Sequence, residues 1–159
     1  MGYYNDAISQ LESILKYNAN KEIVSLYKQN IEEIFCGIYM INYVSNRIEF
    51  KKRFSSDYFN ISFSCLIESF SLILNNYPRG ASLVLRSSLE NFIKFIIQAN
   101  NKTNFKIDDK IYTNNKATLD RIIEAQDIEP LKKQYFRANS KMQKEYDNLS
   151  GISHSLTLE

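Results

Sequence analysis

Hydrophobic residues recur at helical spacing along nearly the whole chain, and no stretch alternates at the period of a strand. The periodic segments predict helices over residues 5–17, 21–53, 57–75, 78–99, 118–126 and 130–151. Gly (4) and Pro (2) are scarce, which argues against an all-β fold that needs many tight turns. We therefore predict an all-α single domain over residues 1–157. It should be an antiparallel bundle of four main helices with short additional helices.

Polar and turn-forming residues mark the predicted boundaries. Ser55-Ser56-Asp57 offers an N-cap for the helix that follows, and Pro78 suits the first turn of the next one. Gly37 is a candidate bend inside the long 21–53 helix. Residues 100–117 show no helical period, which predicts a long loop, with either a short extended piece at residues 110–113 or a mobile segment. Gly151 is a candidate helix terminator.

The predicted 78–99 helix is apolar on most of its sides. One apolar stripe consists of Leu85, Leu89, Phe92 and Ile96. Further apolar positions lie on both sides of this stripe. Such a helix belongs at the centre of a bundle or at a subunit interface. Together with 11 Tyr and 10 Phe in a chain of 159 residues, this predicts self-association as a homodimer.

Charge and cysteine content exclude several classes of protein. The net charge of +2 is too small to indicate nucleic-acid binding, although Lys51, Lys52 and Arg53 lie close to Arg47. That cluster is either a solvated helix end or a patch that contacts phosphates. Cys36 and Cys65 lie in apolar helical patterns without a CxxC motif, so we expect buried free thiols and no metal site or cofactor.

Targeting signals are not evident in the sequence. The apolar stretch at residues 61–77 is short and interrupted by Glu68, so we expect no membrane span. No signal peptide is recognisable, and we expect a cytoplasmic protein. The terminal pair Leu158-Glu159 resembles a cloning remnant and is set aside from the fold.

The first candidate site is the pair Arg86 and Glu90 within the apolar 78–99 helix. Residues four apart share one helical face, and this face continues to Ile93 and Ile97, which predicts partial burial of the pair. One interpretation is a structural ion pair. The other is a binding site, in which Arg86 offers planar donors to a phosphate or carboxylate and Glu90 orients it.

The second candidate site is the segment Tyr146–His154, which holds the only histidine of the chain. If the last helix continues past Gly151, Tyr146, Ser150 and His154 share one face. His154 is then either a surface histidine or a general acid or base that titrates near neutral pH.

These features together resemble the HEPN superfamily of small, prokaryotic helical domains. The resemblance rests on the all-helical pattern, Arg86-x-x-x-Glu90 in a central helix and Leu149-Ser150-x-x-x-His154 near the end of the last one. It implies a dimeric domain from a toxin–antitoxin, phage-defence or mobile-element setting. Active members are metal-independent ribonucleases that carry Arg, then four to six intervening residues, then His. Here the nearest upstream arginine is Arg137.

The sequence therefore favours a non-enzymatic, HEPN-like binding module that self-associates and takes a protein or RNA ligand. Its candidate binding residues are Arg86, Glu90, Tyr146, Ser150, His154, Lys51, Lys52 and Arg53. A ribonuclease that uses His154 with Arg86 is the enzymatic alternative, and Glu90 is its third candidate catalytic residue. A protein–protein interaction module that uses the apolar helical surface is the third.

Overall fold

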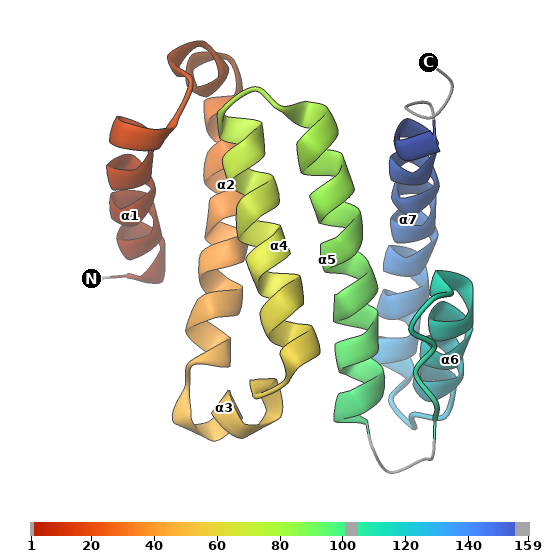
Figure 1. The fold of residues 1–159 in the computed structure, drawn as a ribbon. Coiled ribbons are helices and arrows are strands. Elements are labelled where there is room, and N and C mark those ends of the chain that lie inside the picture. Colours follow the sequence, from red (N-terminus) through yellow and green to blue (C-terminus); the bar gives the residue numbers. More distant parts are fainter. Residues whose placement is uncertain (1, 101–104, 155–159) are drawn as a thin grey trace.

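The computed structural model describes residues 2–100 and 105–154, and within these ranges the chain forms seven helices and no strand. The prediction of an all-α fold is confirmed. In chain order the helices are α1 (Tyr3–Asn18), α2 (Lys21–Ser45), α3 (Ile48–Phe54), α4 (Asp57–Leu74), α5 (Pro78–Ala99), α6 (Tyr112–Glu124) and α7 (Glu129–His154). Figure 1 shows α4 and α5 in the middle, with α1 and α2 on one side and α6 and α7 on the other.

The α4–α5 pair is held together by small buried residues. The Ser62 hydroxyl donates to the Ser88 carbonyl at 2.9 Å, and the Ser88 hydroxyl returns a bond to the Ser62 carbonyl at 2.8 Å. Two turns further along, the Ser69 hydroxyl donates to the Ala81 carbonyl at 2.9 Å. The residue numbers rise on one helix as they fall on the other, so the two helices run antiparallel. Short side chains let the backbones approach closely, and each buried hydroxyl has an acceptor.

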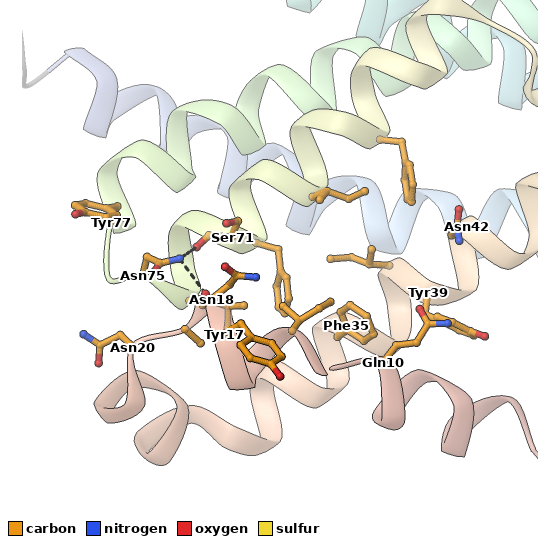
Figure 2. Close-up of a pocket in the computed structure, with 17 residues that line it drawn as sticks. Gln10, Tyr17, Asn18, Asn20, Phe35, Tyr39, Asn42, Ser71, Asn75 and Tyr77 are labelled. Carbon is orange, nitrogen blue, oxygen red and sulfur yellow. Dashed lines mark hydrogen bonds between the residues drawn. The ribbon is translucent and has the colours of Figure 1, made fainter. Parts of the chain in front are cut away.

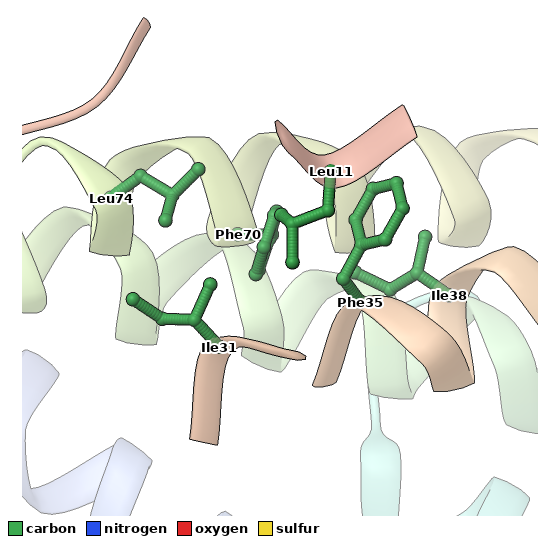
Figure 3. Close-up of a cluster of buried hydrophobic side chains, with 6 residues drawn as sticks. All are labelled: Leu11, Ile31, Phe35, Ile38, Phe70 and Leu74. Carbon is green, nitrogen blue, oxygen red and sulfur yellow. The ribbon is translucent and has the colours of Figure 1, made fainter. Parts of the chain in front are cut away.

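Two hydrophobic cores lie on opposite sides of this pair. The first joins α1, α2 and α4 (Figure 3), and its buried members are Leu11, Ile31, Phe35, Ile38, Phe70 and Leu74. The second joins α5, α6 and α7, and its buried members are Ile93, Ile97, Tyr112, Leu119, Ile122 and Tyr146. The second core is more polar because it contains two tyrosines whose hydroxyl groups need partners.

The predicted 21–53 helix is two helices in the structure. α2 ends at Ser45 and α3 begins at Ile48, so the prediction of one continuous helix was wrong. Irregular backbone inside α2 occurs at Tyr27 (φ −123°, ψ 26°), whereas the helix continues through Gly37. The buried side of α2 does not continue into α3, where no residue is buried and Ile48 is 91% exposed.

The segment expected to be a loop over residues 100–117 contains the start of α6. The helix begins at Tyr112, so the predicted extended piece at 110–113 was wrong, and residues 101–104 lie outside the described residues. Asp108 organises this start. Its carboxylate accepts from the backbone N–H groups of Lys110 and Ile111, both at 2.9 Å, and from the Asn114 amide at 2.7 Å. These bonds, led by that from Asn114, lower the pKa of Asp108.

The last helix does not stop at Gly151. α7 continues to His154, and none of the described glycines has the positive φ that a glycine terminator uses. Other expected boundaries hold: α4 ends at Leu74 and α5 runs from Pro78 to Ala99, as the sequence predicted.

Both cysteines are free and half-buried, which confirms the expected thiols but places them nearer the surface than anticipated. Among the described residues, no helix combines the length and apolar character needed to cross a bilayer.

We predict that the α4–α5 contact tolerates no added volume. Ser69 is 2% exposed, so Ser69→Leu should lower the free energy of unfolding by about 1–3 kcal/mol through overpacking. Ser64 lies on the same helix and is exposed, so Ser64→Leu should change it by less than about 0.5 kcal/mol. Urea unfolding of both variants tests this, and equal losses would contradict the close packing.

Candidate functional site

Arg86 and Glu90 lie one turn apart on α5, on the side that faces α7. The Arg86 Nε donates to Glu90 Oε1 at 3.0 Å, and the two side chains are 29% and 33% exposed. On the same side the helix continues to Ile93 and Ile97, which are buried in the second core. The ion pair therefore lies at the edge of that core, partly screened by protein and partly open to water.

Tyr146 of α7 completes this site. Its hydroxyl donates to the same Glu90 oxygen at 2.9 Å, and its ring lies 5.1 Å from the Arg86 guanidinium carbon. Burial, followed by the hydrogen bond to Glu90, raises the pKa of Tyr146. The structure thus brings one residue of the Tyr146–His154 segment to the Arg86–Glu90 pair. Because Glu90 Oε1 accepts from both neighbours, Glu90 fixes their positions relative to each other.

Tyr112, at the start of α6, stacks on Tyr146 with ring centroids 3.6 Å apart and planes inclined by 6°. Tyr112 is 8% exposed, and its buried hydroxyl has no hydrogen-bond partner among the described residues. Burial, with smaller contributions from neighbouring charges, raises the pKa of Tyr112 to about 12. The sequence analysis did not identify this residue, because it was placed in an expected loop.

A second cluster of the same kind lies between α6 and α7. The Tyr135 hydroxyl donates to Asp120 Oδ1 at 2.8 Å, and Lys116 Nζ lies 3.1 Å from Asp120 Oδ2. Each cluster contains a basic residue, a carboxylate four residues later and a tyrosine from α7. The i, i+4 spacing of Lys116 and Asp120 was a visible signal that the sequence analysis missed. The repetition indicates that both clusters fasten α7 to the rest of the molecule.

Ser150 and His154 are the other predicted site residues of α7. Since the helix continues past Gly151, Tyr146 and His154 are separated by eight helical residues, or about 12 Å along the axis. The side chains of Ser150 and His154 lie outside the described residues. Their expected part in the site therefore stays a prediction.

The basic cluster lies apart from Arg86. Lys51, Lys52 and Arg53 are exposed in the last turn of α3. Lys52 and Arg53 line a cleft with Gln98, which is twelve residues from Arg86 on α5, or about three helical turns. These residues therefore do not join Arg86 in one site.

The geometry at Arg86 suits binding and positioning. A planar guanidinium held by a carboxylate and an aromatic ring is a ready contact for a carboxylate or phosphate. Within the described part of the chain, no group of three or more His, Cys, Asp or Glu side chains is placed to hold a metal ion.

In comparisons with known proteins, the chain matches no family model, no curated protein and no solved structure.

We predict opposite effects for the two stacked tyrosines. Tyr146→Phe loses a hydrogen bond to a carboxylate and should lower the free energy of unfolding by about 1.5–3 kcal/mol. Tyr112→Phe keeps the stack and removes an unpartnered buried hydroxyl, so stability should be unchanged or rise by about 1 kcal/mol. Denaturant titrations of both variants provide the measurement, and similar losses would show that Tyr112 has a partner of its own.

We also predict that stability falls in alkaline solution. An unfolded tyrosine loses its proton near pH 10, whereas folded Tyr112 keeps it until about pH 12. Between these values the folded state binds more protons, so the free energy of unfolding decreases as pH rises. In Tyr112→Phe this decrease should be shallower, because one of the titrating groups is gone. An identical slope in wild type and variant would contradict the raised pKa.

Proposed function

We propose that the protein is a helical binding module, similar to non-enzymatic HEPN domains, that self-associates as a homodimer. The observation that carries this proposal is the apolar side of α5, which its neighbouring helices leave partly uncovered.

The two uncovered sides of α5 differ in character. Ser87, Asn91 and Gln98 make one side polar. The other side carries the apolar stripe noted in the sequence, in which Leu85, Leu89 and Ile96 are half-buried and Phe92 is 41% exposed. Ile41 of α2, 37% exposed, lies beside this stripe. Leu85, Leu89, Phe92 and Ile41 line a groove of about 180 Å³ whose lining is almost wholly apolar, whereas Ile96 packs against the second core.

A second copy of the chain is the occupant that this groove fits. In a two-fold dimer each chain presents the same patch, so one contact covers Phe92 and Ile41 of both partners. Exposed apolar residues that cluster in this way are typical of interfaces. The groove lacks charged residues along its lining, as the centre of an interface requires.

The Arg86 site supports a binding role for the same module. Glu90 and Tyr146 hold the guanidinium in place, and its side chain keeps 29% exposure. We propose that the Arg86 guanidinium contacts an acidic or phosphate group of a protein or RNA ligand.

We further propose that α2, α4, α5 and α7 make up a four-helix antiparallel bundle. The axes of these helices run roughly alongside one another in Figure 1. Two free thiols fit a reducing, cytoplasmic setting.

We predict that Phe92→Asp abolishes dimer formation. The wild type should sediment at about twice the 18.6 kDa chain mass at micromolar concentration, and the variant at the chain mass. A charge in the apolar contact should weaken association at least about tenfold, or 1.4 kcal/mol. Leu83→Asp is the matched control, since Leu83 is 40% exposed on the opposite side of α5. A monomeric wild type, or dissociation by both variants alike, would refute the proposed interface.

A further inference from the structure

A cleft of about 770 Å³ opens between α1, α2 and α4 (Figure 2). Arg86 does not line it, since it lies on α5 and faces α7. Its apolar lining comes from the first core, chiefly Phe35, Ile38, Phe70 and Leu74. Its rim carries polar and amphipathic side chains from all three helices. A concave, mainly apolar cavity with a few polar groups is the usual form of a small-molecule site, and typical volumes are about 300–1,000 Å³.

Hydrogen bonds fix the walls of the cleft at one end. The backbone N–H of Asn20 donates to the Leu74 carbonyl at 2.8 Å. The Asn75 amide donates to the Asn18 carbonyl at 3.2 Å and to the Ser71 carbonyl at 2.9 Å. These bonds tie the end of α1 to the end of α4, and Figure 2 shows those from Asn75 as dashed lines.

The other end of α1 is also attached. The Tyr3 hydroxyl donates to the Cys36 carbonyl of α2, and its ring packs against Tyr39 with centroids 5.3 Å apart. Because α1 is held to its neighbours at both ends, the hollow between them is part of the fold. A ligand would therefore find its site formed in advance.

No charged side chain lines the cleft. A charged ligand group would lose hydration there without gaining a counter-ion, which is costly. Hydrogen-bonding groups are available instead. Among the described residues, the side-chain amides of Gln10 and Asn18 have no hydrogen-bond partner, although both line the cleft. Each amide can both donate and accept.

We propose that this cleft binds an uncharged small molecule with an aromatic or aliphatic body and at least one hydrogen-bonding group. The body packs on Phe35 and Phe70, and the polar group bonds to Gln10 or Asn18. The exposed tyrosines Tyr17 and Tyr77 cover the ligand at the mouth. This inference is independent of the proposed self-association, which uses α5.

Two fluorescent probes that differ by one charge test the proposal. N-phenyl-1-naphthylamine is neutral, and 8-anilinonaphthalene-1-sulfonate carries the same rings with an added sulfonate. In titrations of the full chain, the neutral probe should saturate at one molecule per chain and bind at least about tenfold more tightly than the anionic one. Absence of saturable binding, or equal affinity for both probes, would overturn the proposal.

Two variants and a matched control locate the binding. Ile67→Asp puts a charge at the cleft, and Ser71→Trp fills it without one; each should weaken binding of the neutral probe at least about tenfold. Ile61 lies on the same helix with the same exposure as Ile67, 47%, but outside the cleft lining, so Ile61→Asp should bind normally. Phe92→Asp should also bind normally. Loss of binding in Ile61→Asp or Phe92→Asp, or full retention in both cleft variants, would place the probe elsewhere and refute the site.

Discussion

The close contact between α4 and α5 is the constraint on which the rest of the molecule depends. Reciprocal hydroxyl-to-carbonyl bonds between Ser62 and Ser88 require the two backbones to approach closely. With the pair fixed, each helix has its remaining sides free for other neighbours. α4 contributes Phe70 and Leu74 to one core, and α5 contributes Ile93 and Ile97 to the other. Serine is suited to this role because it is small and its hydroxyl can donate to a carbonyl of the neighbouring helix.

The two halves of the molecule enclose different kinds of side chain. The half built on α4 encloses mainly aliphatic and phenyl groups and leaves an uncharged hollow under α1. The half built on α5 encloses tyrosines, and carboxylates at its edge accept hydrogen bonds from two of the tyrosine hydroxyl groups. A chain with 11 tyrosines needs such acceptors, since an unpaired buried hydroxyl costs about 1–3 kcal/mol. Glu90 and Asp120 supply them, each held by a basic residue on its own helix.

Local patterns predicted those parts of the fold that local forces determine. The bounds of α5 follow from Pro78 and from the apolar run that ends before Asn100. The break between α2 and α3 was missed because residues 46–47 carry no glycine or proline to announce it. α6 was placed too late because its first turn is polar, and its start depends on hydrogen bonds that the Asp108 carboxylate accepts, which no hydrophobic period reveals.

The candidate site likewise combines a local contact that the sequence predicted with long-range contacts that it did not. The Arg86–Glu90 contact follows from helical spacing alone, so the sequence was sufficient to predict it. Tyr146 joins the pair only because α7 packs beside α5, and Tyr112 reaches Tyr146 only because α6 packs against both of these helices in the second core. Such contacts link residues more than thirty positions apart, and periodicity in one sequence carries no information about them. His154, the only histidine of the chain, lies about two helical turns beyond Tyr146.

In the short helix α3, surface charge is independent of folding stability, although the two properties are usually coupled in small domains. It buries no residue, and only Phe54, which stacks on Phe95, packs against aromatic rings of the neighbouring helices. Its basic side chains are exposed to solvent, so substitutions there can change the surface potential with little effect on the free energy of unfolding. In evolutionary terms, the electrostatic character of this end of the molecule can diverge while the two cores stay the same.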